Sequence, residues 1–467
     1  MNRVYLLALL VAGLAAVTVA VKYAPDTDRA TAAQNAGSEQ AAPNFVIFIA
    51  DDLGWNDIGV YGNRAVHTPN IDNIAAGGLR FDNVFLTTSS CSASRASILT
   101  GKYPHSNGLV HLHQSLSASE STLGQLLAQG GYHTESVGKW GLGPDVKPQF
   151  SSVIEERTDS STERWVERLK QRPVDKPFFF WLASRDPHRP FSGGADLDLH
   201  KYDPGELVIP SDFVDGPGTR QEFAAYYSEV TRFDRDIGLV MEELDAQGVL
   251  DNTLVIIMSD NGRPFINDKQ TLYDDGIKTP FILHWPRMIT RPGERRQLIS
   301  IVDLAPSLLD WAGLPVPVDM QGHSISATLD DPDITIREYI YAERNWHARN
   351  YHERALRSLD YLYKENQHPM HGACVRPLYA SKQHYKDFLA AYQQERLEQP
   401  EKDCFARNRA PVELMAIDPE GNTRPGNLVA VEEHAAALHS MRTSLERWRR
   451  DTGDFDYLPY ERPDAKK

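Results

Sequence analysis

Four short apolar runs, each closed by reactive residues, constrain the fold more than any other feature of the chain. They are NFVIFIADD (44–52), HTESVGK (133–139), PFFFWLASRDPH (177–188) and NTLVIIMSDNG (252–262). Runs of β-branched and aromatic residues without alternation are typical of strands buried on both faces of a largely parallel sheet. The clearest intervening helix spans 221–247, where apolar residues recur three or four positions apart before Gly248. The sequence therefore predicts an α/β fold whose large, mostly parallel sheet is sandwiched by helices.

The N-terminal segment differs from the rest of the chain. Arg3 precedes an apolar run from Val4 to Val21. Such a run is typical of an export signal, but it is also close to the shortest membrane span. Residues 1–22 are therefore either a signal peptide or an N-terminal membrane anchor, and the polar residues 23–42 are expected to be a flexible linker. Both alternatives predict an exported protein, periplasmic or extracellular, with membrane attachment only through this segment.

The net charge limits the partners of the folded part. It is −15, from 49 basic and 64 acidic residues. Sequence-independent binding to nucleic acid needs a basic surface, so nucleic acid is not an expected partner. Residues 43–342 are expected to form the main domain, and residues 343–467 a smaller α+β subdomain. In that subdomain, residues 354–366 indicate a strand pair and residues 432–453 a final amphipathic helix.

Two acidic pairs at strand ends predict a metal site. Ligands of open α/β sheets bind beyond the carboxyl ends of the strands. Asp51 and Asp52 close one run, and Asp260 and Asn261 close another. Their hard oxygens suit Ca²⁺ or Mg²⁺ better than Zn²⁺. A single Asp or Asn is more often a cap or turn residue, but two pairs in equivalent positions favour the metal.

Cys91 is one of three cysteines and lies in the polar stretch SSCSASRASILTG (89–101). It is predicted to begin a helix that Gly101 ends, where free N–H groups and the helix dipole lower a thiol pKa and attract anions. Arg95 follows one turn later on the same side. A nucleophile, a guanidinium and a hard cation together predict a site for a tetrahedral oxyanion. Cys374 and Cys404 lie in the loop-rich C-terminal region and are expected to form a disulfide after export.

The segment from Cys91 to Arg95, with its continuation ASILTGKYPHSNG, resembles the signature of the type I sulfatases in the alkaline phosphatase superfamily. The resemblance extends through FVIFIADDLGW, TPNIDNIA, SDNGRPF, IVDLAPSLLDWAGL and AIDPEGNTRPGNLV, and so covers most of the chain after residue 43. It implies hydrolysis of sulfate from a sulfated saccharide. It also implies that Cys91 is oxidised to formylglycine by a formylglycine-generating or sulfatase-maturing enzyme.

The same resemblance assigns roles to the matching positions. It makes Ca²⁺ the metal, held by the formylglycine derived from Cys91 and by Asp51, Asp52, Asp260 and Asn261. It assigns Arg95 to stabilising the formylglycine hydrate and the metal site. The residues that it assigns to binding sulfate oxygens or protonating the leaving atom are Lys139, His188 and Lys269.

Two positions depart from the family pattern. Ala93 stands where proline is commoner, and Gly141 stands where many relatives have a histidine that helps to activate the hydrate. His111 and His113 are candidate substitutes, although each is also consistent with a structural or substrate-facing role. Lys278 is assigned to packing or rim electrostatics.

Several short motifs most resemble the heparan N-sulfatase (sulfamidase) branch, which implies N-sulfoglucosamine as the substrate. They are NGLVHLHQ, DPHRPF, SDNGRPF and SLERWRRDTGDF. In the segment ERNWHARN, Arg344, His347 and Arg349 either contact an anionic sugar or are surface residues. Three alternatives stay open: an O-sulfatase, a phosphomonoesterase or phosphodiesterase of the same superfamily, and a catalytically silent glycan-binding protein.

Overall fold

The computed structural model describes residues 41–155, 161–191, 202–398, 401–406, 408–419 and 421–455. The predicted signal or anchor (1–22) and nearly all of the expected linker lie outside these ranges. Across the ranges that are described, no helix combines the length and apolar character that crossing a membrane requires.

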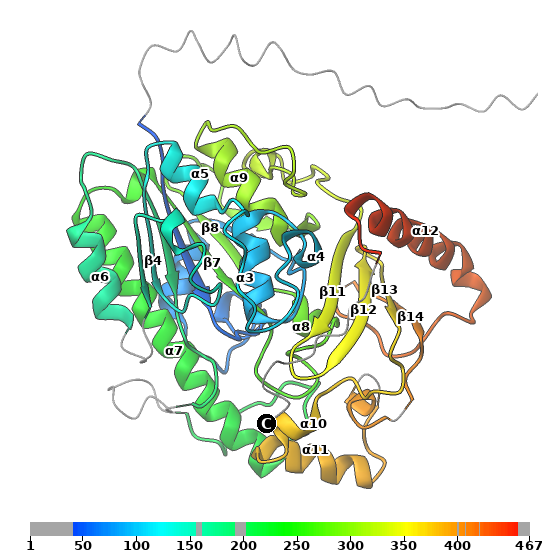
Figure 1. The fold of residues 1–467 in the computed structure, drawn as a ribbon. Coiled ribbons are helices and arrows are strands. Elements are labelled where there is room, and N and C mark those ends of the chain that lie inside the picture. Colours follow the sequence, from blue (N-terminus) through cyan, green and yellow to red (C-terminus); the bar gives the residue numbers. More distant parts are fainter. Residues whose placement is uncertain are drawn as a thin grey trace, which may run out of the picture. The chain divides into compact units, whose positions relative to one another are not determined.

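The central sheet has eight strands in the order β5-β4-β6-β1-β7-β8-β2-β9 (Figure 1). The four apolar runs form its neighbouring parallel strands β4 (His133–Gly138), β6 (Phe178–Ala183), β1 (Asn44–Ala50) and β7 (Thr253–Ser259). The flanking strands are β5 (Ser152–Glu155), β8 (Phe281–His284), β2 (Leu79–Phe81) and β9 (Gly293–Arg295). β8 runs antiparallel to both β7 and β2. The prediction of a mostly parallel sheet is therefore confirmed.

Helices cover both faces of this sheet. On one face, a buried cluster joins Val46 and Phe48 of β1 to the helices α6 (Ser161–Gln171), α7 (Pro217–Ala246) and α2 (Pro69–Ala76). The other joins Ile47 and Ile49 to α3 (Cys91–Thr100), α5 (Leu123–Gln129) and α9 (Leu304–Trp311). α7 begins at Pro217, four residues before the predicted start, because Pro217 occupies the first helical turn, where proline is tolerated.

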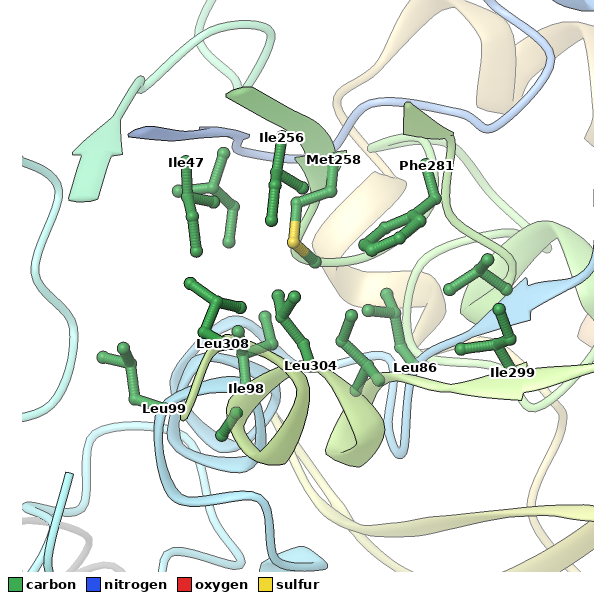
Figure 2. Close-up of a cluster of buried hydrophobic side chains, with 14 of the residues drawn as sticks. Ile47, Leu86, Ile98, Leu99, Ile256, Met258, Phe281, Ile299, Leu304 and Leu308 are labelled. Atoms are coloured by element: carbon green, nitrogen blue, oxygen red, sulfur yellow. The ribbon is translucent and has the colours of Figure 1, made fainter. Parts of the chain in front are cut away.

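The helix that carries Cys91 is fixed to the sheet by apolar packing (Figure 2). Ile98 and Leu99 of α3 lie beside Leu304 and Leu308 of α9, and both pairs face Ile47 of β1 and its neighbours on β7. Every residue of α3 is buried. The position of its first residue is therefore set by the main core.

The C-terminal part forms a second, antiparallel sheet in the order β11-β12-β13-β14. Its strands are β11 (Ile340–Trp346), β12 (Asn350–Arg357), β13 (Tyr361–Asn366) and β14 (Val412–Ala416), and α12 (Ala435–Thr452) packs against them (Figure 1). β12 and β13 are the expected strand pair. The sheet begins at Ile340, slightly before the expected domain limit at 343, which falls inside β11.

Short elements connect these layers. They are β3 (Val84–Phe85), β10 (Ile299–Ser300), α4 (Pro104–Asn107), α8 (Asp274–Ile277), α10 (Arg376–Tyr379) and α11 (Gln383–Gln393). Between β13 and β14, Cys374 and Cys404 lie with their Cα atoms 4.6 Å apart. That separation is within the range that a disulfide spans.

We predict that Leu308→Ala lowers the free energy of unfolding by about 2–5 kcal/mol, because it leaves a cavity between α9, α3 and the sheet. The measurement is the urea midpoint followed by intrinsic fluorescence. Val318→Ala is the matched control, since the Val318 side chain is fully exposed and its truncation removes no packing. Equal midpoints for the two variants would contradict the role of this contact.

Candidate active site

The predicted site residues meet at the carboxyl edge of the central sheet. Asp51 and Asp52 directly follow β1, Lys139 follows β4, and Asp260 and Asn261 follow β7. Cys91 is the first residue of α3 and approaches from the side, with its Sγ atom 3.7 Å from Asp51 Oδ1 and 3.9 Å from Asp52 Oδ1. Because the strands are parallel, side chains that are far apart in sequence share one edge.

The acidic side chains form a buried cluster around the thiol. Asp51, Asp52, Cys91 and Asp260 each offer a ligand atom, and these atoms lie within 4.8 Å of one another. All four residues are buried. Asn261 joins the cluster through its Nδ2 atom, which donates to Asp52 Oδ1 at 2.5 Å. The structure thus brings together the whole predicted metal-ligand set.

A separate cation pairs with each carboxylate. Lys139 Nζ lies 2.5 Å from Asp51 Oδ2, and Arg95 Nε lies 2.7 Å from Asp260 Oδ2. Lys269 Nζ reaches both oxygens of Asp52, at 2.6 and 2.8 Å. Unpaired charges would be very costly in such a buried place, so these pairs are what makes the cluster tolerable.

These charges also set the pKa values. Burial alone would raise the pKa of Asp51, but Lys139, His188 and Lys269 outweigh it and hold that pKa below its usual range. Burial raises the pKa of Asp260 in spite of the Arg95 guanidinium. His188 Nε2 lies 3.8 Å from Asp52 Oδ2, and its side chain is 41% exposed, so it faces the solvent side of the cluster.

The expected activation of the Cys91 thiol is wrong. The helix N-terminus predicted a lowered pKa, yet the pKa of Cys91 is raised to about 12. Burial is the main cause; the cations Lys139 and Lys269 lower the pKa and the carboxylates of Asp260 and Asp51 raise it, but the lysines do not offset the burial. The unmodified side chain is therefore a neutral thiol and a poor nucleophile.

Two buried polar atoms of the cluster have no hydrogen-bond partner in the described part of the chain. They are Asn261 Oδ1 and Arg95 Nη2. Buried polar atoms are nearly always paired, so such an acceptor beside three carboxylates fits a hard, oxygen-preferring cation. The free guanidinium N–H fits an additional oxyanion. The residues present therefore suit both a metal ion and a negatively charged substrate group.

A histidine from the C-terminal subdomain also reaches this edge. His347 follows β11, and its Nδ1 atom lies 3.1 Å from the hydroxyl of Ser90, the residue that caps α3 before Cys91. Burial and the nearby cations Lys269 and Arg344 hold the pKa of His347 well below its usual range, so the imidazole is neutral. Sequence reasoning left His347 undecided between a sugar contact and the surface, because the Ser90 contact joins residues far apart in the chain.

The other histidine candidates lie differently. Gly141 has a φ of 78°, and a Cβ atom there would meet only Arg95 Cδ at 3.5 Å and Ser92 Oγ at 3.8 Å. His111 is buried, and its backbone forms an isolated parallel β-bridge with Trp346. Burial lowers the pKa of its imidazole to about 4. His113 is exposed. The neutral imidazole beside the capping residue of α3 is thus His347 rather than either expected substitute.

A buried ion pair that sequence reasoning missed supports the loop of His188. Arg232 of α7 donates through Nε to Asp186 Oδ2 at 2.6 Å, and the Asp51 N–H donates to the Asp186 carbonyl at 2.9 Å. Arg232 looks like an ordinary polar residue of an amphipathic helix. Its pairing with Asp186 depends on the close approach of α7 to the end of β6, which local sequence does not indicate.

Two further basic residues have structural contacts. Arg344 pairs with Glu353 at 3.1 Å and lies over the Tyr351 ring at 3.4 Å. Lys278 is buried with its Nζ atom 3.7 Å from the centre of the Trp55 ring, in keeping with the packing role expected for it.

Comparison with known proteins places this site in a family. A family profile described as Sulfatase matches residues 43–314, more than half of the chain. Human N-sulphoglucosamine sulphohydrolase is 36% identical over 309 residues, which cover 59% of this chain and 61% of that relative. An ulvan-active sulfatase of Formosa agariphila is 29% identical over 337 residues, covering 69% of this chain and 66% of the relative. The chain therefore matches less than two thirds of the length of either relative.

Solved structures share the fold at low sequence identity. One, a complex with its substrate D-glucosamine-2-N,6-O-disulfate, aligns with a TM-score of 0.68 at 20% identity and covers 89% of this chain and 99% of its own. A 2-O GAG sulfatase aligns with the same TM-score and identity, over 90% of this chain and 95% of its own. With the matching family profile, these findings confirm the resemblance carried by the segment from Cys91 to Arg95, and the chain belongs to the sulfatase family.

Proposed function

We propose that this protein hydrolyses sulfate from a sulfated saccharide, with Cys91 converted to formylglycine and Ca²⁺ as the metal. The grouping of Cys91 with three buried carboxylates and three paired cations carries the proposal. Formylglycine, as its hydrate, supplies the nucleophilic hydroxyl that a neutral thiol lacks, and Ca²⁺ supplies further positive charge. The ligands proposed for Ca²⁺ are Asp51, Asp52, Asp260, Asn261 and the modified residue 91.

The side chains of the chain perform the remaining tasks. Lys139 and Lys269 hold positive charge where the sulfate oxygens bind, and Arg95 offers its unpaired Nη2 as a further donor. Such fixed charges stabilise the transition state because they need no reorganisation during the reaction. His188, on the more exposed side, holds the proton that the leaving atom takes up when its bond to sulfur breaks.

N-sulfoglucosamine of heparan type is the proposed substrate, with cleavage of the S–N bond. The name of the human relative and the motifs HLHQ and DPHRPF support this choice. An amine leaving group must be protonated as the bond breaks, and His188 is suited to that role. The second candidate is an O-sulfatase on another polysaccharide, which the likeness to the ulvan-active sulfatase favours.

We also propose that the protein works after export. The apolar run from Val4 to Val21 supports this, as does the pairing of Cys374 with Cys404, whose Cα atoms lie 4.6 Å apart. Disulfides persist in oxidising compartments such as the periplasm. The maturation enzyme that acts on Cys91 is a proposed partner of the newly made chain.

The first functional prediction concerns maturation. In active protein from a host with a maturation enzyme, the peptide that contains Cys91 should carry the mass of formylglycine instead of a thiol. Cys91→Ser should become sulfated and stop, because a serine ester has no second hydroxyl through which to collapse to an aldehyde. Mass spectrometry checks both results. An active enzyme that retains the Cys91 thiol would disprove this role.

The second prediction concerns the metal. Asp260→Asn should reduce bound Ca²⁺ and lower activity at least about a hundredfold, because it removes a ligand charge and leaves Arg95 without its partner. Asp251→Asn, at an exposed position away from the cluster, should retain both metal and activity. Elemental analysis measures the metal content. Stoichiometric Zn²⁺ without Ca²⁺ in the unaltered protein would contradict the proposal.

The third prediction concerns the substrate. Purified protein that carries formylglycine should release sulfate from N-sulfoglucosamine, and ion chromatography measures the release. A panel of O-sulfated monosaccharides and a phosphate monoester serve as comparisons. Release from the O-sulfated sugars alone would reject the N-sulfatase assignment while leaving a sulfatase. Hydrolysis of the phosphate ester alone would reject both.

A further inference from the structure

A cavity of about 460 Å³ lies in the C-terminal subdomain, in a part of the molecule to which the proposed reaction assigns no role. Two arginines and a tyrosine supply its polar lining, and small or apolar side chains supply most of the rest. These residues are Arg349, Arg376, Tyr385, Met370, Ala380 and Ala406. A cavity of this volume is large enough for one sugar unit or a comparable polar group.

The charge of this cavity is opposite to that of the chain as a whole. The net charge is −15, yet no aspartate or glutamate is among the described residues that line the cavity. Neither Arg349 nor Arg376 forms an ion pair within the described ranges. Other arginines of the subdomain are paired: Arg354 lies 2.6 Å from Asp454, and Arg409 contacts Glu353. Two guanidinium groups are therefore available for an anion.

Two segments of the cavity wall are close in sequence to residues that interact with the active site. Arg349 comes two residues after His347, whose imidazole contacts Ser90 beside Cys91. In the second segment, Arg376 and Ala380 lie before and after Tyr379 of α10, and the charges of Lys269 and Asp52 both act on the Tyr379 phenol. These two segments are the structural link between the cavity and the edge of the sheet that carries Cys91.

The wall that carries Arg376 is held in place by backbone contacts. Arg344 Nη2 donates to the Ala373 carbonyl at 2.7 Å, and Arg409 Nε donates to the His371 carbonyl at 2.8 Å. The Tyr351 hydroxyl donates to the Gly372 carbonyl at 3.1 Å. The segment before Arg376 is thus fixed before any ligand arrives, which reduces the entropic cost of binding.

We infer that this cavity is a subsite for a second acidic group of the saccharide, on the sugar unit next to the one that loses its sulfate. The group is a carboxylate or a sulfate, because a guanidinium matches the paired oxygens of either. The inference rests on the proposed hydrolysis of a sulfated saccharide. It adds that the protein recognises at least two units of the glycan.

The test compares a monosaccharide with matched disaccharides. The substrates are N-sulfoglucosamine, a disaccharide that joins it to a uronic acid, the carboxyl-reduced form of that disaccharide, and the reduced form with an O-sulfate on the second unit. Arg349→Gln and Arg376→Gln should each raise KM for the acidic disaccharide roughly tenfold and leave the monosaccharide unchanged. Arg450→Gln, an exposed arginine of the same subdomain, is the control and should change neither.

The arms of the experiment separate the possible outcomes. If the KM of the wild-type protein rises when the carboxyl group of the disaccharide is reduced, the bound group is a carboxylate. If the KM falls again when the reduced disaccharide carries an O-sulfate, the cavity also binds a sulfate. The subsite would be overturned if wild type and both arginine variants had equal KM values for the disaccharides. It would also be overturned if the variants raised KM for the monosaccharide as much as for the acidic disaccharide.

Calorimetric binding of the desulfated disaccharide tests the subsite without turnover. If no sugar releases sulfate, the proposed function fails, and this binding measurement still decides the subsite. Weaker binding by Arg349→Gln and Arg376→Gln, compared with Arg450→Gln, supports the subsite, whereas unchanged binding rejects it.

Discussion

Neutralisation of three buried carboxylates is the constraint on which the site depends. Asp51, Asp52 and Asp260 lie in a dry part of the sheet edge, where isolated charges would cost several kcal/mol each. Their cations come from three separate segments: the end of β4, the start of α3 and the loop after β7. The three carboxylates are therefore all neutralised only when the sheet, the helix and the loop have assembled. The site forms only in the fully folded protein.

The two parts of the fold both contribute residues to the proposed recognition of an anion. The central sheet supplies the acidic cluster and its paired cations, whereas the C-terminal sheet extends the loop between β11 and β12 over the edge. That loop carries His347, which contacts the cap of α3, and Arg349, which lines a cavity without acidic residues. In the proposed function the central sheet binds the reacting group, and in the further inference the C-terminal sheet binds the next unit of the ligand.

Local sequence signals predicted the strands and the residues at their ends, because burial on both faces leaves a clear apolar pattern. The acidic pairs at the ends of two such strands also predicted the buried cluster, because parallel strands bring their carboxyl ends to one edge of the sheet. Long-range contacts were not predictable in the same way. The partner of Arg232 and the approach of His347 to Ser90 depend on how distant elements pack. The thiol pKa was mispredicted because the helix dipole is a local effect, whereas burial is set by the whole fold.

The burial of α3 has a consequence for the order of events in the life of the chain. All ten residues from Cys91 to Thr100 are enclosed, and the Cys91 side chain is only 4% exposed. A second protein that modifies this residue must first reach its side chain, and the folded structure leaves almost none of it accessible. The rate of modification therefore competes with the rate of folding, because a chain that folds first buries Cys91 before it is modified. The speed of synthesis and export, as well as the amount of modifying enzyme, would then determine what fraction of molecules is active.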